Sequence, residues 1–190
     1  MLKKYVFIIF LWTFFSGMSQ DKIVCRISTS MGDIDVALYQ KKAPITVANF
    51  LRYVDANLYQ NSSFFRVCTP ENEADREIKI QVIQGGDVPE NEQFEAIEIE
   101  TTEKTGILHK NGTLSMARAE PNSATCSFFI CIGDQASLDY GGQRNPDGQG
   151  FAAFGQVLKG MELVKKIQDE KDDGQYLVNP IIINSIKRIN

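Results

Sequence analysis

Residues 63–87 read SFFRVCTPENEADREIKIQVIQGGD, and two polar side chains stand in unusual places within them. Arg66 interrupts the apolar run FFRV, and Gln84 ends the run VIQ just before a Gly-Gly pair. Charged and amide side chains seldom lie on the buried faces of strands. The stretch therefore predicts two strands, at 63–67 and 78–83, that hold a guanidinium and a carboxamide beside apolar surface.

Outward from this stretch, alternation of apolar and polar residues predicts a chain made mainly of strands. Residues 23–29 and 34–38 alternate on either side of a turn and predict a hairpin. The further strands are predicted at 93–99, 112–117, 127–132, 152–157 and 181–189.

Two segments show helical spacing instead. Pro44 stands where a helix can begin, and a second short helix is predicted at 161–169. The apolar faces would be Val47, Phe50, Leu51, Val54 and Leu58 in the first helix, and Met161, Val164 and Ile167 in the second. Many strands, two helices and no alternation of strand and helix indicate one antiparallel barrel or sandwich domain.

The first 19 residues have a different character. Lys3 and Lys4 precede an eleven-residue, mainly apolar stretch, and small residues follow up to Ser19. This pattern is typical of a secretory signal peptide at 1–19, with a mature domain at 20–190. A membrane-spanning helix needs about 20 apolar residues. We therefore expect an extracytoplasmic, periplasmic protein with no stable membrane span after cleavage; an uncleaved anchor is the alternative.

Charge and cysteine content exclude several kinds of partner. The chain has 20 basic and 24 acidic residues, and loss of Lys3 and Lys4 makes the balance more acidic, which argues against nucleic acid. His109 is the only histidine and no CxxC pair exists, so neither a metal nor a cofactor is expected. An extended segment between Cys126 and Cys131 would separate them by about 16 Å, too far for a disulfide. Other pairings and free buried thiols stay open.

Several motifs in order identify a family resemblance. The segments FFRV, VIQGGD, GTLSMARAEPNSATCSFFICIGD, SLDYG and FAAFGQVLKGMELVKKI resemble the cyclophilin-type peptidyl-prolyl cis-trans isomerases. The MAR triplet is most similar to the exported bacterial members, and the resemblance covers about residues 23–189. It implies an all-β fold, a closed eight-stranded antiparallel barrel capped by two α-helices. It also implies a substrate groove on the outer wall, proline-containing polypeptides as partners and, we expect, a monomer.

The resemblance also assigns residues to roles. Arg66 would stabilise the twisted amide by donating to the proline nitrogen, and Gln84 would anchor the substrate backbone. The substrate-binding residues would be Val82, Met116, Ala117, Arg118, Ala119, Ser127, Phe129, Leu138 and Phe151. Five of these residues have a structural alternative. Arg66 could pair with a nearby glutamate and Gln84 could be a turn-entry residue. Met116 and Phe129 could be ordinary core residues, and Arg118 could be a solvated surface charge.

The chain departs from the family pattern at several positions. Gln81 and Val82 replace a Phe-Met pair, Ser127 replaces a glutamine, Ser137 a tryptophan and Phe151 a histidine. These changes predict an isomerase with reduced or substrate-selective activity. A proline-peptide binding module with little catalysis is the alternative, and a holding chaperone is a third possibility. The acidic loop 70–77 could overhang the groove, where its acids could select basic substrates or compete for Arg66. Both this loop and the turn-rich loop 141–150 could instead be surface connections.

Overall fold

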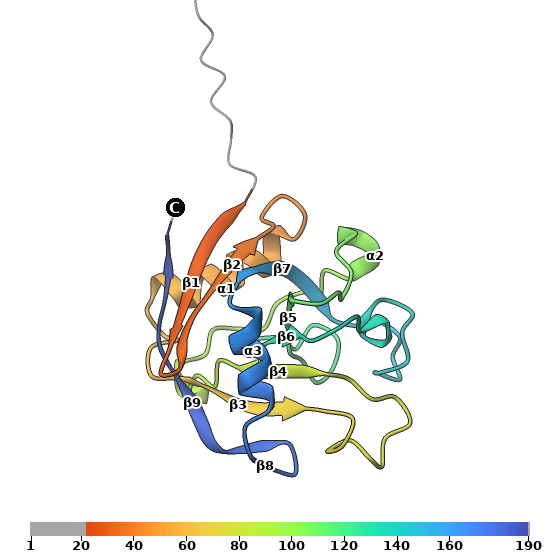
Figure 1. Cartoon of the computed structure of the whole chain (residues 1–190). Helices are drawn as coiled ribbons and strands as arrows, with labels where there is room; N and C mark the ends of the chain where they lie inside the picture. Colours follow the sequence, from red (N-terminus) through yellow and green to blue (C-terminus); the bar gives the residue numbers. More distant parts are fainter. Residues whose placement is uncertain (1–21, 190) are drawn as a thin grey trace, which may run out of the picture.

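The computed structural model describes residues 22–189, so the predicted signal peptide lies outside the described residues (Figure 1). The strands are β1 (Ile23–Thr29), β2 (Gly32–Leu38), β3 (Ser63–Cys68), β4 (Val82–Gly85), β5 (Thr113–Met116), β6 (Phe128–Cys131), β7 (Ala152–Lys159), β8 (Asp172–Asp173) and β9 (Tyr176–Arg188). The helices are α1 (Pro44–Asp55), α2 (Thr102–Thr105) and α3 (Met161–Gln168), with single 3-10 turns at Glu90–Glu92 and Ala136–Leu138.

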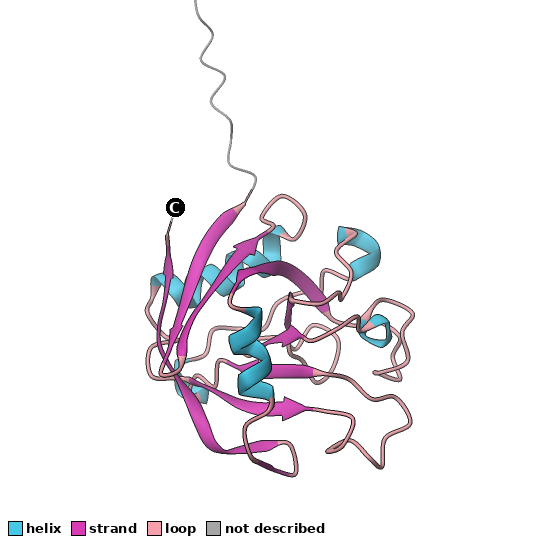
Figure 2. Ribbon diagram, in the orientation of Figure 1, coloured by secondary structure: helices cyan, strands magenta, loops and turns pink. Residues whose placement is uncertain are grey.

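The strands form a closed antiparallel barrel. Neighbouring strands follow the order β1-β2-β7-β5-β6-β4-β3-β9, and β1 also pairs with β9, which closes the ring at eight strands. The two-residue β8 pairs only with the start of β9. The predicted eight-stranded barrel is therefore confirmed, and the ribbon view shows strands from both ends of the chain side by side (Figure 2).

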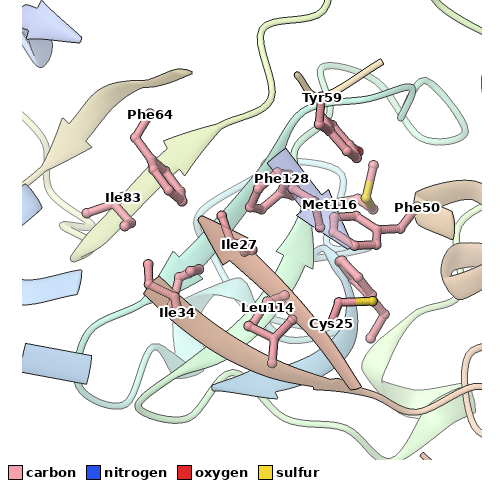
Figure 3. Packing of buried hydrophobic residues seen from close by; sticks show 14 of the residues in the cluster. Cys25, Ile27, Ile34, Phe50, Tyr59, Phe64, Ile83, Leu114, Met116 and Phe128 are labelled. Atoms are coloured by element: carbon pink, nitrogen blue, oxygen red, sulfur yellow. The ribbon is translucent and has the colours of Figure 1, made fainter. Parts of the chain in front are cut away.

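The interior of the barrel is filled with apolar side chains rather than left open. Phe50 of α1 packs edge-on against Phe128 and also contacts Phe154, so the helix contributes directly to the core (Figure 3). Val164 and Ile167 of α3 belong to the same cluster. Because α1 packs on β7 and β9 while α3 packs on β2, β3 and β4, the two helices cover different parts of the barrel. With the core occupied, any groove must lie outside the wall.

A β-bulge in β3 explains the unusual position of Arg66. The register with both β4 and β9 shifts between Phe64 and Arg66, so one extra residue is inserted there. Phe64 and Val67 are fully buried in the core, whereas Arg66 faces outward. In a regular strand Phe64 and Arg66 would share one face. The bulge thus lets an apolar strand present a guanidinium to the outside.

Gly85 allows the close approach of β3 and β4 that this arrangement needs. A side-chain carbon at this position would lie 2.7 Å from Phe64 Cδ1 and 2.9 Å from the Ser63 carbonyl oxygen. These separations are too short for any residue other than glycine without movement of the backbone. Gly85 is therefore a packing requirement.

Three strand predictions need correction. The strand predicted at 181–189 is β9, which begins earlier, at Tyr176, and ends at Arg188. Residues 93–99 form no strand and make one isolated bridge, between Ile97 and Ala124. Their backbone groups bond to α1 instead: Tyr53 Oη accepts from the Phe94 N–H at 2.8 Å, and Arg52 donates to the Glu95 carbonyl at 2.6 Å.

The strand predicted at 78–83 begins only at Val82. Side chains again replace strand partners, because Glu73 accepts from the Ile80 N–H and Arg144 donates to the Ile78 carbonyl.

Other predictions are confirmed. Both expected helices form, and the one-turn helix α2 is an addition that the pattern did not reveal. Cys126 and Cys131 are not bridged, and all four cysteines are free and buried. Burial raises the pKa of the Cys25 and Cys68 thiols to about 11. Within residues 22–189, no helix combines the length and the apolar character that crossing a bilayer requires.

Candidate active site

Arg66 and Gln84 lie opposite each other on the outside of the barrel. They are direct partners in the register of β3 and β4, so their side chains share a face. Arg66 Nη1 donates to Gln84 Oε1 at 2.8 Å, and both side chains are half-buried. No ion pair joins Arg66 to a carboxylate among the described residues, so the proposed ion pair with a nearby glutamate is absent. The structure thus brings together the two residues that the sequence singled out.

Gln175 fixes the guanidinium from the other side. Its Oε1 accepts from Arg66 Nε at 3.0 Å and from Nη2 at 2.5 Å, while its Nε2 lies 3.3 Å from Glu73 Oε1. A guanidinium has five N–H donors. Gln84 and Gln175 take three, which leaves one on Nη1 and one on Nη2 without a partner among residues 22–189. Arg66 is therefore oriented and still able to donate.

Ser127 holds the amide of Gln84 in one orientation. Gln84 Nε2 donates to Ser127 Oγ at 3.0 Å, and that hydroxyl donates to the Gly85 carbonyl at 3.0 Å. The carboxamide oxygen therefore faces Arg66, and the amide nitrogen faces Ser127. The serine that replaces the family's glutamine thus has a defined contact within the site.

A cavity of about 250 Å³ lies beside this pair, and we call it the outer cavity. Phe129 and Leu138 are almost fully buried, so they form its floor. Phe129 also meets Phe151 edge-to-face, with 5.4 Å between ring centroids. Its apolar lining is Ile80, Val82, Ala117, Phe129, Leu138 and Phe151, and its polar lining is Arg66, Arg76, Gln84, Arg118, Arg144 and Asn145.

Arg118 is a fixed part of this lining. Its guanidinium makes two bonds of 2.8 Å to the carboxylate of Asp147, and Nε donates to the Gly150 carbonyl at 2.8 Å. The side chain is 2% exposed and lies over the Phe151 ring. The interpretation of Arg118 as a solvated surface charge is therefore wrong. The hydrogen bonds from Arg118 also lower the pKa of the Asp147 carboxyl.

Three of the predicted substrate-binding residues, Met116, Ala119 and Ser127, do not line the outer cavity. Ser127 contacts the lining residue Gln84 instead. Met116 is 1% exposed and packs in the barrel core near Phe50 and Phe128 (Figure 3), as its structural alternative proposed. It also lines a smaller hollow next to Arg118. Ala119 is exposed, and its N–H is bonded to Ser123 Oγ at 3.1 Å.

The loop at 70–77 presents a cation, not acids, to the outer cavity. Its only buried acid is Glu73, whose carboxylate accepts two hydrogen bonds from Arg144, while Arg76 lines the cavity. Burial alone would raise the pKa of Glu73, but the Arg144 bonds, the Ile80 N–H and the Arg76 charge lower it overall. The loop at 141–150 supplies Arg144 and Asn145 to the cavity and is thus more than a surface connection.

His109 supports the cavity floor from behind. Its ring stacks on Phe129, and it bonds to Asp139 and to Ser115 through its two nitrogens. Burial would raise the pKa of the Asp139 carboxyl, but its two hydrogen bonds from His109 lower it overall.

Sequence reasoning missed several members of this site for different reasons. Ile80 could have been found, because it lies on the same face as Gln84 and Val82 at a period of two. Gln175 and Arg144 could not, because they reach their partners across 109 and 71 residues of chain. Their local sequence shows only turn-forming residues.

Comparison with known proteins agrees with this geometry. Residues 24–188 match the model of the family "Cyclophilin type peptidyl-prolyl cis-trans isomerase/CLD". The chain is 37% identical over 171 residues to peptidyl-prolyl cis-trans isomerase A of Dickeya dadantii (strain 3937), covering 86% of this chain and 83% of that protein. It is 36% identical over 143 residues to peptidyl-prolyl cis-trans isomerase B of Escherichia coli (strain K12), covering 74% and 80%.

The fold has solved counterparts as well. A crystal structure of a cyclophilin type peptidyl-prolyl cis-trans isomerase of Cryptosporidium parvum superposes with a TM-score of 0.72 at 22% identity, covering 89% of this chain and 98% of that one. Fold and sequence agree, and the chain belongs to the family of cyclophilin-type peptidyl-prolyl cis-trans isomerases.

Proposed function

We propose that the outer cavity is where the isomerase acts, with Arg66 as the donor to the proline nitrogen and Gln84 as the anchor of the substrate backbone. The observation that carries this proposal is the Arg66–Gln84 hydrogen bond at the rim of a cavity with an apolar floor. The floor suits a proline ring, and the rim suits the amide that precedes it.

The chemistry needs no nucleophile. Rotation about a peptide bond faces a barrier of about 18–20 kcal/mol from resonance. In the twisted state conjugation is lost and the proline nitrogen regains its lone pair, which can then accept a hydrogen bond. A donor that binds only this state lowers the barrier without stabilising the ground state.

Arg66 meets these requirements. Its charge persists at any working pH, and two of its N–H groups remain available. A charge-assisted hydrogen bond contributes about 1.5–3 kcal/mol, or roughly 10- to 150-fold in rate. Because Gln84 and Gln175 already orient the guanidinium, little reorganisation is needed when the amide twists.

The remaining site residues divide between ring and backbone. Val82, Phe129, Leu138 and Phe151 would enclose the proline ring, with Phe129 and Leu138 as its floor. The segment 117–119 and Ser127 would align the residues before the proline, and Met116 would support that segment from the core. Burial of the proline ring favours binding by about 25 cal/mol for each Å² of apolar surface removed from water.

The biological setting is part of the same proposal. Residues 1–19 would direct export, and the mature chain would act as a periplasmic monomer on proline-containing segments of other exported proteins. The lysines and the short apolar stretch at the N-terminus support this assignment.

Exchange spectroscopy by NMR on an X–Pro peptide tests the mechanism directly. We expect wild-type protein to accelerate exchange, and Arg66→Ala to lower the rate at least tenfold with peptide binding largely kept. Arg66→Lys keeps the positive charge but removes the planar set of guanidinium donors, so it separates the two contributions. Arg188→Ala is the control, because Arg188 makes an exposed ion pair with Asp55 away from the cavity. Unchanged exchange in Arg66→Ala would remove the donor role.

A further inference from the structure

The outer cavity extends beyond its apolar floor into a group of cationic side chains. Arg76 and Arg144 line it together with Asn145, at the side where Ile80 forms the wall. Glu73 connects this side to Ile80, because its carboxylate binds both Arg144 and the Ile80 N–H.

Positive charge exceeds negative charge around this cavity. Four arginines line it, at positions 66, 76, 118 and 144, and no acid is among the lining residues. Two carboxylates stand behind them, Glu73 against Arg144 and Asp147 against Arg118. Arg76 also lies near Glu73, so three of the arginines share two carboxylates and the group keeps a net excess of two positive charges. The overall net charge of the chain, by contrast, is −4. This local excess attracts anions.

Arg144 is held rigidly at this side. Nη1 donates to Glu73 Oε2 at 2.9 Å and to the Ile78 carbonyl at 2.5 Å, and Nη2 also donates to Glu73. The Arg144 side chain is 7% exposed, whereas that of Arg76 is 58% exposed and lies 3.8 Å from Glu73. One guanidinium is thus fixed, and the other can move toward a bound group.

Asn145 adds an unused donor. Its Nδ2 is buried and has no hydrogen-bond partner within residues 22–189, although the residue lines the cavity. A buried polar group without a partner is costly. Rotation of the Asn145 amide toward the cavity would let an acceptor there remove that cost. Carboxylate oxygens accept such bonds and pair with guanidinium groups in matching geometry.

We propose that Arg76, Arg144 and Asn145 form a carboxylate subsite that favours substrates with an acidic group directly after the proline. This inference rests on the function proposed above. If segment 117–119 aligns the residues before the proline on one side of the floor, the residues after it lie toward Ile80 and the arginines on the other side. The carboxylate comes from an Asp or Glu side chain, or from the chain terminus of a C-terminal proline.

Peptides that differ in one group test this subsite. We expect X–Pro–Asp to exchange roughly 5- to 30-fold faster than X–Pro–Asn at low salt and limiting peptide, with a smaller ratio at high salt because the subsite is partly exposed. Asp placed before the proline should give no such advantage over Asn. Equal rates for X–Pro–Asp and X–Pro–Asn would overturn the subsite.

Variants then connect the preference to these residues. Arg76→Gln and Asn145→Ala should each bring the Asp/Asn ratio toward one, and Arg76→Gln avoids the buried charge that removal of Arg144 would leave. The matched control is Lys79→Gln, the same charge change three residues on, at an exposed side chain outside the cavity lining. A ratio that survives Arg76→Gln and Asn145→Ala, or that falls equally in Lys79→Gln, would overturn the assignment.

A second experiment distinguishes the two possible sources of the carboxylate, an acidic side chain and the chain terminus of a C-terminal proline. NMR titration compares Ala-Pro as a free acid with Ala-Pro amide, using wild-type protein and Arg76→Gln. Tighter binding of the free acid, lost in the variant, assigns the subsite to chain termini as well, whereas equal binding restricts it to acidic side chains. Absence of catalysis with every peptide would contradict the proposed function itself, which is a different outcome from catalysis without an acidic preference.

Discussion

The ring of His109 lies parallel to that of Phe129, with 5.9 Å between centroids and 16° between planes. His109 is 1% exposed and absent from the cavity lining, so it supports Phe129 on the face away from the cavity. Its Nδ1 lies 2.7 Å from Asp139 Oδ1 and its Nε2 lies 2.9 Å from Ser115 Oγ. The floor of the cavity is therefore held by a polar chain buried beneath it.

Replacement of this histidine should affect the floor as well as the stability. His109→Ala removes the stacked ring, leaves the buried Ser115 hydroxyl without its partner and takes one of two hydrogen bonds from Asp139, at a cost of about 1–3 kcal/mol. His109→Phe loses the same two side-chain contacts but keeps a ring behind Phe129. We therefore expect a similar loss of stability in both variants, but a several-fold larger fall in isomerisation rate for His109→Ala.

Thermal unfolding and exchange spectroscopy on both variants measure this difference. Faster flipping of the Phe129 ring in His109→Ala, seen by aromatic NMR, would identify loss of support as the cause. If both variants lose activity in proportion to stability, His109 has only a structural role.

Gln175 should be a positioning residue for Arg66. It occupies the left-handed region at φ 81°, which is unfavourable for a side chain by roughly 1 kcal/mol. Gln175→Gly removes this strain together with the two hydrogen bonds to Arg66. We expect an unchanged or higher melting temperature and a fall of about 3- to 10-fold in the exchange rate, with peptide affinity nearly unchanged.

Gln156→Ala serves as the matched control, because Gln156 is a half-buried glutamine on β7 that bonds to the Asn111 carbonyl outside the cavity. Loss of activity together with stability in Gln175→Gly would instead indicate that the turn itself needs this residue.

Glu73 should make stability depend on pH. Its folded pKa is lowered below the ordinary value of 4.5, so the folded state binds the proton less tightly than the unfolded chain does. Its contribution is therefore fully present above about pH 4.5 and is lost as the pH falls through the lowered folded pKa. Glu73→Gln leaves Arg144 as an unmatched buried charge, at about 3 kcal/mol or roughly 6–12 °C at neutral pH.

The measurement is the melting temperature of both proteins between pH 7 and pH 2.5. The difference between the two melting temperatures, which we call the gap, should be widest at neutral pH. It should close in acid, where the glutamate is protonated and resembles glutamine. Glu162→Gln, at an exposed pair with Lys165, should show no such gap. A gap that is constant across the pH range would contradict the ion-pair account.

The N-terminal segment should be removed on export. When the full chain is expressed in a bacterial host, we expect mature protein that begins at Gln20 and fractionates outside the cytoplasm. Ile9→Arg, in the middle of the apolar stretch, should block processing and serves as the control. Mass spectrometry of the intact protein measures the cleavage point, and retention of residues 1–19 on a membrane-bound product would favour the uncleaved anchor.

The sequence predicts the barrel well where pairing between strands alone provides hydrogen-bond partners for the backbone N–H and C=O groups. Alternation identifies β1, β2, β3, β5, β6 and β7 nearly to the residue. It fails at 93–99 and at 78–81, where the side chains of Tyr53, Arg52, Glu73 and Arg144 satisfy the backbone instead. Such contacts depend on the tertiary structure, and no local pattern contains them.

The residues of the site likewise fall into two groups, those that the sequence identifies and those that only the tertiary structure brings together. Arg66, Gln84, Phe129 and Leu138 belong to strands or motifs whose order identifies them, so they could be named from the sequence. Three side chains orient or extend the site: Gln175, Arg144 and Asn145. They lie in segments whose composition predicts a turn and indicates nothing about the site. One hypothesis from the sequence is that the acids of the loop at 70–77 select basic substrates, yet Glu73 lies beneath the cavity and Arg76 faces it.

The pairing of β1 with β9 has a consequence for any extended polypeptide that meets the barrel. An open sheet offers unpaired N–H and C=O groups, and an extended polypeptide can add to them as a further strand. Here the ring is closed, and beyond it the described residues contribute only the two-residue β8. Among the described residues, a polypeptide that meets the closed ring therefore finds no barrel edge to which it could add as a strand.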